Sequence, residues 1–327
     1  MKNILIIYHL EDNDGVCSCA ILSDYIRKNF PTCKISYLPA TYRILNDIYA
    51  KGTEYMDEYF APYDACAMLD VSFNEYKGMK YLKQRFGSNF TWCDHHSPII
   101  KLSFKYKFDD VAGVRDKNRS TILNLYKHLY DPFDEKYMTN EVPLLLKYLS
   151  AFDSWTHEAN NLDFETCRYI NTYVTHISKL DVSWWVDVFT LDKVLYTDNN
   201  EFLPDFINAG KEYCDNIDKR NEEMINYAGD IGWTVGPDNR PACMIVIYGG
   251  SNSLMFKSVK DKCKNGIALK KTNGSQWTLS LYNTSDDNTF HCGEYLQKVY
   301  KGGGHEGAAG ATISQSQFIK ILKNKHI

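Results

Sequence analysis

Short hydrophobic runs alternate with amphipathic stretches through the first third of the chain. Four runs are too short for helices and suit strands that are buried on both faces. These runs are residues 2–8, 34–38, 65–69 and 90–93. Between them, apolar positions at helical spacing predict helices over residues 16–28, 42–50 and 73–86. Because parallel strands joined through helices use right-handed crossovers, the pattern predicts an α/β fold with a doubly wound parallel sheet.

The rest of the chain is first helical and then changes to short strands and turns. Helical periodicity covers residues 119–130, 142–151 and 177–227. After a break at 237–241 the pattern predicts strands over 243–248, 266–271 and 277–282, and helices over 292–300 and 315–325. We expect an N-terminal catalytic domain over 1–175, a helical linker over 176–235 and a smaller C-terminal α/β domain over 236–327.

Composition and charge narrow the class of protein. The chain has 327 residues, of which 44% are hydrophobic and 24% charged, so it can bury a core and its length favours about two domains. The net charge of -4 argues against a protein that coats long nucleic acid, although a local basic groove or a small anionic substrate stays open. No apolar run approaches the roughly 18 residues of a membrane helix, so we expect no membrane partner. We also expect no signal peptide, since Met1 leads directly into a strand.

The ten cysteines are scattered and form no Cys-x-x-Cys pair. Cys66 and Cys93 lie inside apolar strand runs, where a free cysteine behaves as a small hydrophobic residue. A disulfide scaffold suits a much shorter secreted chain. We therefore expect all ten thiols to be reduced and the protein to be cytoplasmic.

Acids and histidines follow three of the predicted strands. Asp94, His95 and His96 end the strand at 90–93, before an expected turn at Pro98. The strands at 65–69 and 2–8 are followed by Asp70 and by His9, Asp12 and Asp14, the last three on an expected loop. Because the carboxyl ends of parallel strands meet at one edge, these side chains predict one site there. Asp153, just after the helix at 142–151, is an ordinary helix-end residue when read alone.

This set of side chains suits metal chemistry. Carboxylates can gather at one edge only if something positive neutralises them. Mixed aspartate and histidine ligation favours manganese, zinc or iron over calcium. Two such ions about 4 Å apart, bridged by one carboxylate, would generate hydroxide near neutral pH and support in-line displacement at phosphorus. The alternative is a set of helix caps and surface turns, which such residues also form.

A glycine run near the C-terminus is the second candidate site. Gly302, Gly303 and Gly304 precede His305, so the backbone could approach an anion closely and present N–H groups to it. A flexible loop or a helix cap would also explain the run. It is not a P-loop, because no Gly-Lys-Ser/Thr follows.

Together these motifs resemble the DHH/DHHA1 phosphoesterase family over nearly the whole chain. The family's four N-terminal motifs correspond to His9-x-x-Asp12-x-Asp14-Gly15, Leu69-Asp70, Asp94-His95-His96 and Asp153. Its DHHA1 signature corresponds to Gly302-Gly303-Gly304-His305-x-Gly307-Ala308-Ala309-Gly310. Each motif alone is weak, but five in the right order are specific.

The resemblance implies roles for individual residues. It implies two divalent metal ions, most favourably manganese, bridged by Asp70. One ion would also be bound by His9 and Asp12, and the other by Asp14, His95 and Asp153. His96 would face the scissile phosphate, with Asp94 supporting the site. The glycine run and His305 would hold the nucleotide from the smaller lobe, and Arg119-Ser120 resembles a substrate-contacting segment.

The chain length and glycine lobe look like the nanoRNase (oligoribonuclease) branch, which degrades short oligonucleotides to mononucleotides. The resemblance therefore implies a metal-dependent phosphodiesterase whose partner is a short oligonucleotide or nucleotide, with a homodimer left open. Many family members carry an arginine where this chain reads Ser280-Leu281-Tyr282-Asn283. Tyrosine cannot clamp a phosphate bidentately, so a cyclic dinucleotide or other small phosphoester remains an alternative substrate. A nucleotide-binding protein without turnover is the non-enzyme alternative.

Overall fold

The computed structural model describes residues 2–130, 142–190, 203–236, 239–272, 274–285 and 290–327. Two compact units form the chain, Met1–Cys214 and Asp215–Ile327, and the division falls inside one long helix. The predicted division into a catalytic domain, a helical linker and a smaller domain, with boundaries at 175 and 235, stays a prediction.

A parallel sheet in the order β2-β1-β3-β4 is the centre of the first unit. Its strands are β1 (Asn3–His9), β2 (Lys34–Ala40), β3 (Ala65–Leu69) and β4 (Phe90–Cys93), as the hydrophobic runs predicted. Tyr8 is in register with Leu69, and Leu69 with Cys93. The residues that follow these three strands therefore leave the sheet at the same edge.

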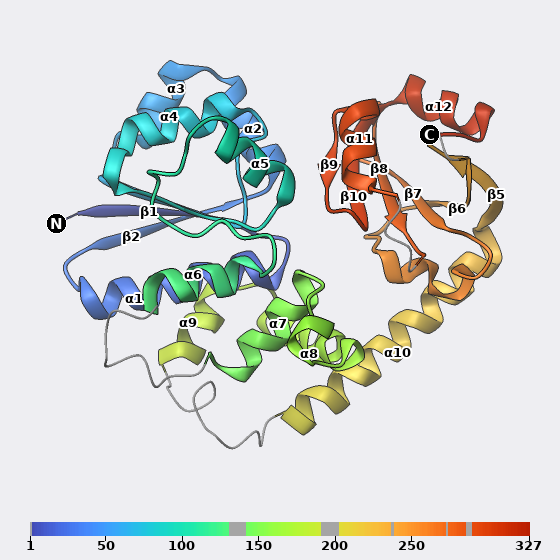
Figure 1. Cartoon of the computed structure of the whole chain (residues 1–327), viewed down its shortest axis with the longest axis horizontal. Coiled ribbons are helices and arrows are strands. Elements are labelled where there is room, and N and C mark those ends of the chain that lie inside the picture. Colours follow the sequence, from blue (N-terminus) through green and yellow to red (C-terminus); the bar gives the residue numbers. More distant parts are fainter. Residues whose placement is uncertain (1, 131–141, 191–202, 237–238, 273, 286–289) are drawn as a thin grey trace. The chain divides into compact units, whose positions relative to one another are not determined.

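Helices cover both faces of this sheet (Figure 1). One face packs against α2 (Tyr42–Ala50), α3 (Thr53–Phe60) and α4 (Tyr76–Phe86), with Leu5 and Ile7 of β1 in its core. The other packs against α1 (Asn13–Asn29), α6 (Thr121–Tyr130), α7 (Leu144–Asp153), α8 (Phe164–Ser178) and α9 (Val182–Thr190). Ile6 and Tyr8 of β1 enter that core. Burial on both faces confirms the doubly wound α/β class.

Three local predictions around the helices that carry candidate site residues were wrong. α1 begins at Asn13 instead of Val16, because the Asp12 carboxylate accepts a hydrogen bond from the Gly15 amide and caps the helix. Pro98 lies in the first turn of α5 (Ser97–Lys105) instead of a turn, a helical position that proline tolerates. Asp153 is the last residue of α7 instead of following the helix.

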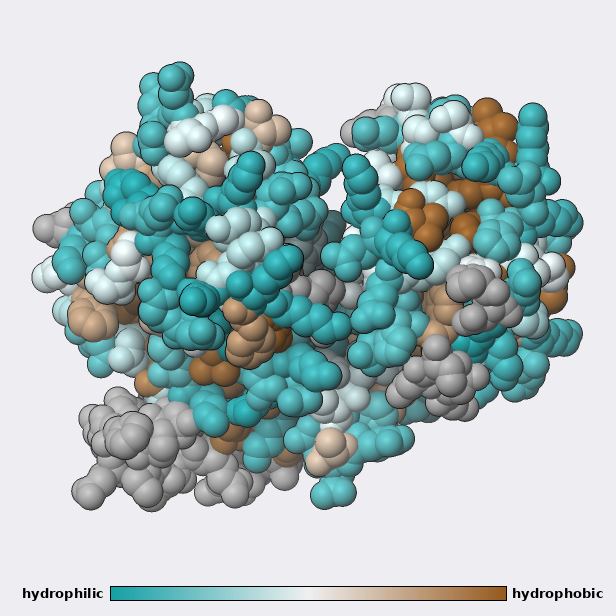
Figure 2. All heavy atoms as spheres, turned by 45° about the horizontal axis from the view of Figure 1, so that its top comes forward, coloured by the Kyte–Doolittle hydropathy of each residue, from teal (hydrophilic) through white to brown (hydrophobic). Residues whose placement is uncertain are grey.

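The predicted helical stretch over 177–227 contains, among the described residues, α9 and α10 (Leu203–Ala228), whereas nearly all of α8 lies before it and had not been predicted. None of the helices among the described residues is long and apolar enough to cross a membrane. Figure 2 shows mainly hydrophilic residues on the face in view. All ten cysteines are free, as predicted.

The second unit contains a six-stranded sheet in the order β5-β6-β7-β8-β10-β9. Its strands are β5 (Asp230–Val235), β6 (Arg240–Ile247), β7 (Asn265–Lys271), β8 (Gln276–Asn283), β9 (Gly303–Gly304) and β10 (Ala308–Ser314). The helices α11 (Cys292–Tyr300) and α12 (Gln315–Asn324) pack on one face, where Trp277 stacks on Phe318 at 3.6 Å. The smaller α/β unit is confirmed, but β5 and β9 had not been predicted, and neither had α3, α5 and α8 of the first unit.

Candidate metal centre

Asp70 lies at the middle of the carboxyl edge, directly after β3. Its backbone has φ of 59°, a left-handed conformation that aspartate adopts more readily than most residues. The Asp70 amide donates to the Cys93 carbonyl at 3.0 Å, which ties this turn to the end of β4. The Asp70 carboxylate is buried, and its Oδ1 accepts a hydrogen bond from the Thr121 hydroxyl at 2.9 Å.

Asp14 projects from the first turn of α1 onto the N-terminus of α6. The Thr121 amide donates to Asp14 Oδ2 at 2.8 Å, and the Ile122 amide donates to Oδ1 at 2.7 Å. These are amides that a helix leaves without partners in its first turn. Asp12 caps α1 in the same region, so the positive ends of two helix dipoles stabilise this pair of acids.

His95 brings the acids from three elements together. Its Nε2 lies 3.1 Å from Asp153 Oδ2, 3.4 Å from Asp70 Oδ1 and 3.7 Å from Asp14 Oδ2. One ligand atom each from Asp14, Asp70 and His95 lie within 4.8 Å of one another, and all three residues are buried. The structure thus unites these predicted residues from α1, the end of β3, the loop after β4 and α7.

The pKa values of the centre are shifted by burial and by the negative charge of its aspartates. Burial, then the charge of Asp153, raises the pKa of Asp14 to about 6. Burial and the charges of Asp14 and Asp12 raise the pKa of Asp70 well above its usual value. Burial alone would lower the pKa of His95, but the Asp153 carboxylate raises it well above its usual range. The site therefore favours a bound positive charge.

Asp94 organises the loop that carries both histidines, and one of its ligand atoms lies within 4.8 Å of ligand atoms of Asp70 and His96. Its Oδ1 accepts hydrogen bonds from the amides of His95 and His96, at 2.7 and 3.0 Å, and from His96 Nδ1 at 2.8 Å. Trp92 Nε1 donates to Oδ2 at 3.2 Å. Burial alone would raise the pKa of Asp94, but the His96 charge and these hydrogen bonds lower it to about 2.

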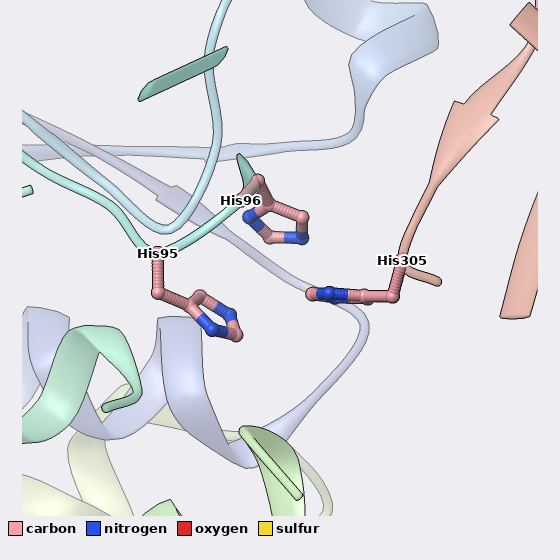
Figure 3. Close-up of side chains that lie close together, drawn as sticks. All are labelled: His95, His96 and His305. Carbon is pink, nitrogen blue, oxygen red and sulfur yellow. The ribbon is translucent and has the colours of Figure 1, made fainter. Parts of the chain in front are cut away.

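The rings of the two histidines lie close together beside this loop (Figure 3). Their ring planes are inclined by 60°, with centroids 4.6 Å apart. His95 Nε2 faces the acids, whereas His96 uses Nδ1 to donate to Asp94. Both rings approach Asp70 Oδ1, at 3.4 Å from His95 Nε2 and 3.8 Å from His96 Nδ1, but His95 also faces Asp153, whereas His96 is hydrogen-bonded to Asp94.

His9 and Asp12 form the other side of the centre. His9 Nε2 lies 3.5 Å from Asp12 Oδ2, at the end of β1. The Tyr42 ring contacts the rings of both His9 and His96, with centroids 6.0 and 6.1 Å apart. Burial and the charges of Asp94 and Asp70 raise the pKa of Tyr42 well above its usual value, so this phenol lies in the same negative field.

The predicted substrate-contacting pair has other partners. Arg119 donates from Nε and Nη2 to Asp116 Oδ2, at 3.1 and 2.7 Å. Ser120 is fully buried, and its amide donates to the Ser150 hydroxyl at 3.2 Å. In this structure the segment secures the start of α6, and its role in substrate contact stays a prediction.

The glycine run of the second unit is an edge hairpin, in which β9 pairs with β10. Gly303 and Gly304 form β9, and the His305 amide donates to the Ala308 carbonyl at 2.7 Å. A Cβ on Gly302 would lie 2.3 Å from the Gly310 carbonyl oxygen, and one on Gly304 2.6 Å from the Ala308 oxygen. Packing explains these two glycines, whereas Gly303 faces open space, where a ligand can approach the backbone.

Tyr282 occupies the strand position where the family resemblance led us to look for an arginine. Its ring is buried, and its hydroxyl is 2.8 Å from the Ser251 hydroxyl. This tyrosine is therefore part of the core of the second unit and offers little surface for stacking on a base.

Sequence reasoning missed several residues that organise the centre. Thr121 binds both Asp14 and Asp70. Asn124 donates from its side-chain amide to the carbonyls of Asp94 and Asp116, at 3.2 and 2.9 Å, and so joins two loops. Trp92 supports Asp94. A threonine near a predicted helix start indicates a helix cap, but the partners of Thr121, Asp70 and Asp14, lie 51 and 107 residues away in the chain.

The residues present fit divalent metal ions. Three buried carboxylate and imidazole ligand atoms within 4.8 Å of one another match the donors that first-row metals take. Burial and the neighbouring acids raise the pKa values of Asp14 and Asp70, so a bound cation would stabilise their ionised forms. Asp94, held by Trp92 and two backbone amides, supplies the supporting hydrogen bonds that metal sites use to fix a neighbouring histidine loop.

An open α/β sheet with a carboxylate and imidazole cluster at its carboxyl edge defines the class of fold and site. The DHH domain of a protein described as a member of a family of ribosomal proteins aligns with 99% of this chain and 85% of its own, with a TM-score of 0.57 and 12% identity. The chain therefore has the fold of a DHH-domain protein, which confirms the predicted resemblance at the level of the fold.

Two other solved structures show weaker likeness. A pGpG-specific phosphodiesterase from Vibrio cholerae aligns with 99% of this chain and 96% of its own, with a TM-score of 0.45 and 12% identity. RecJ from Thermus thermophilus, in complex with Mn2+, aligns with 99% of this chain and 51% of its own, with a TM-score of 0.48 and 13% identity. A scan against protein-family models found no match, and neither did a search of the curated proteins.

The metal-free protein should become less stable as pH rises from 5 to 7.5. The pKa of Asp14 is raised from 3.8 to about 6 on folding, so the folded state binds this proton more tightly than the unfolded state. Its stabilisation of up to about 3 kcal/mol is fully present only below pH 3.8 and is lost as pH rises through about 6, so about half of it is lost between pH 5 and 7.5. Thermal unfolding in chelator across this range checks the sign, and Asp14→Asn should reduce the slope. A melting temperature that is constant in wild type would contradict the expectation.

Proposed function

We propose that the chain is a metal-dependent phosphodiesterase that hydrolyses short oligonucleotides to nucleoside monophosphates. The observation that carries the proposal is the convergence of Asp14, Asp70 and His95, whose ligand atoms lie within 4.8 Å of one another at the carboxyl edge of the sheet. The DHH-domain fold supports this assignment, because the predicted family motifs occupy that edge. The metals would supply a hydroxide nucleophile near neutral pH and neutralise charge on the phosphate.

The protein's own residues would divide the work of holding two ions. Asp70 is proposed as the bridging ligand because its Oδ1 is close to His95 on one side, and Asp12 raises its pKa from another. His9 and Asp12 would complete one ligand set, and they already lie 3.5 Å apart. Asp14, His95 and Asp153 would complete the second set. Thr121 would hold the Asp70 carboxylate in position through its hydroxyl.

His96 is proposed to contact the scissile phosphate. The ionised Asp94 carboxylate accepts a hydrogen bond from His96 Nδ1, so Nε2 is the ring nitrogen assigned to the substrate. Trp92 fixes the other oxygen of Asp94, and this chain of contacts orients the imidazole. In that role His96 would bind and orient a phosphate oxygen without being needed to retain the metals.

Metal identity and location complete the proposal. We favour manganese because a mixed carboxylate and imidazole set suits a first-row metal of intermediate character. Asp14, Asp70 and His95 supply both kinds of donor within one cluster. We propose a cytoplasmic location because all ten cysteines are free thiols, which a reducing compartment maintains.

A cyclic dinucleotide or another small phosphoester is the second candidate substrate. The observation that favours it is Tyr282, which is buried against Ser251 where an arginine would offer a bidentate phosphate clamp. A nucleotide-binding protein without turnover is less favoured, because every acid and histidine of the predicted ligand set is present. Product analysis with a panel of phosphodiesters separates these candidates.

Substrate length should discriminate between short-strand and long-strand nucleases. We expect dinucleotides to be hydrolysed with higher kcat/KM than long single strands, since a long-strand nuclease needs an extended basic groove and this chain has a net charge of -4. His305→Ala should raise KM for dinucleotides and leave metal content unchanged, because His305 is proposed to hold the substrate's nucleotide. Steady-state kinetics over a length series, with manganese, measures both effects.

The control for His305 is His326→Ala, a histidine of the same unit whose Nε2 lies 3.0 Å from the Gly236 carbonyl oxygen. It should leave the kinetics unchanged. Equal or better rates on long strands would point to a processive exonuclease, and hydrolysis confined to cyclic dinucleotides would establish the second candidate.

A further inference from the structure

Trp155 has an unusual backbone conformation beside the candidate metal centre. Its φ is 56°, in the left-handed region that bulky residues rarely adopt and that costs on the order of 1–3 kcal/mol. Hydrogen bonds hold the turn: the Thr156 amide donates to the Ala151 carbonyl at 3.1 Å, and the Ser154 and Thr156 hydroxyls are 2.9 Å apart. The turn therefore keeps a large aromatic residue where glycine would fit with less strain.

The indole is supported on one side and open on the other. Trp155 stacks on Phe164 with centroids 5.3 Å apart and planes inclined by 21°, and Phe164 stacks on Phe152 at 6.0 Å and 22°. Phe164 begins α8, whose N-terminus is capped by Asp163. Trp155 nevertheless remains 53% exposed. A fixed ring with an accessible surface is the arrangement that aromatic side chains use to stack on nucleobases.

The position of this ring relative to the metal ligands suits a nucleotide. Trp155 follows Asp153 by two residues, and two residues span at most about 7 Å of backbone. The Asp153 carboxylate lies 3.1 Å from His95, inside the candidate centre. In a nucleotide the base is separated from its phosphate by a single sugar. A phosphate at the metals could therefore place its own base near this turn.

We propose that the exposed face of Trp155 is a stacking platform for the base of the nucleotide that carries the scissile phosphate. This proposal rests on the proposed phosphodiesterase function and assigns a determinant of substrate binding to it. Purines offer a larger ring surface than pyrimidines, so the platform gives purine dinucleotides a lower KM. Because stacking does not read hydrogen bonds, the preference extends to both adenine and guanine.

A purely structural role for Trp155 makes a different prediction. If the indole only stabilised the turn through Phe164, its removal would change the melting temperature and affect all substrates alike. If it stacks on a base, the effect of its removal depends on whether that base is present. Glycine at this position separates the two roles, because glycine adopts positive φ without strain while removing the ring.

The experiment compares Trp155→Gly and Trp155→Phe with wild type on purine and pyrimidine dinucleotides, and on dinucleotides with an abasic sugar at either position. For purine dinucleotides, we expect Trp155→Gly to raise KM by about 5- to 100-fold with its melting temperature retained, and Trp155→Phe to keep most of the affinity. The effect should disappear on the substrate that lacks the stacked base. An equal KM for Trp155→Gly and wild type, or an increase that is the same on both abasic substrates, would overturn the platform.

Phe30→Ala is the matched control, since Phe30 is 51% exposed and follows the C-terminal end of α1, at the opposite end of that helix from Asp14. It should leave KM unchanged on every substrate. If wild type hydrolyses none of the dinucleotides, the proposed function fails. The platform is then decided by binding: AMP should quench the fluorescence of wild type more than that of Trp155→Phe, and equal quenching would overturn it.

Discussion

Replacing Asp70 by alanine or asparagine should reduce kcat/KM of the manganese-loaded protein by on the order of 1000-fold or more. Asp70 lies at the centre of the group, 3.4 Å from His95 and bonded to Thr121, and is the proposed ligand of both ions. Loss of a ligand shared by two ions removes more of the site than loss of a terminal ligand. Elemental analysis of the purified variant should accordingly find less metal than in wild type.

The asparagine variant also tests whether lost activity comes from unfolding. Burial and neighbouring acids raise the pKa of Asp70, so a neutral amide should make the metal-free protein more stable at pH 7.5. If the melting temperature of Asp70→Asn rises while its activity falls, Asp70 serves function and not stability. Asp110→Asn, at a carboxylate that is 69% exposed, is the control and should change neither. Full activity of Asp70→Ala, or of wild type in excess chelator, would exclude the two-metal proposal.

The second large effect should separate His95 from His96. His95→Ala should lower metal content together with activity, because Nε2 lies within 3.1–3.7 Å of three acids. His96→Ala should keep the metals and reduce kcat by about 100-fold or more, because its Nδ1 is engaged by Asp94 and its proposed partner is the phosphate. Elemental analysis and kinetics on the same folded preparations measure both quantities.

His176→Ala is a suitable control for this pair, since His176 bonds to the Tyr213 hydroxyl at 2.6 Å on a helix that carries none of the proposed ligands. It should retain metal and activity. Equal loss of metal in His95→Ala and His96→Ala would show that the two histidines are equivalent ligands and would contradict the separate roles.

The strands of the first unit could be predicted because burial on both faces leaves a local trace. β3 and β4 were predicted to the residue, since each is a short run that is apolar except for Thr91 and is bounded by turn residues. Their parallel register then explains why Asp70 and Asp94 leave at the same edge. The start of α1 was missed because Asn13 and Asp14 are common in loops, whereas here Asp12 caps the helix and carries them into its first turn.

The contacts that organise the candidate centre could not be predicted in the same way. Asp14 accepts from the amides of Thr121 and Ile122, which are more than a hundred residues away in the chain. Trp92 reads as a core residue of a buried strand, and only the fold shows its indole N–H directed at Asp94. Such bonds depend on how α6 and β4 pack, and no periodicity in the sequence encodes that packing.

The roles of the individual glycines in the run at 302–304 could not be predicted from the sequence either. Close approach to an anion was one interpretation of the three glycines, but contacts with the Gly310 and Ala308 carbonyls account for Gly302 and Gly304. Only Gly303 is left with open space at its Cα. The motif predicted where the backbone is unusual, whereas the cause at each position came from the pairing of β9 with β10.

Anomalous X-ray scattering from crystals grown with manganese is the most direct test of the two-metal centre. We expect two peaks about 4 Å apart on either side of the Asp70 carboxylate, one near His9 and Asp12 and the other near His95 and Asp153. A single peak, or peaks away from Asp70, would contradict the two-metal centre.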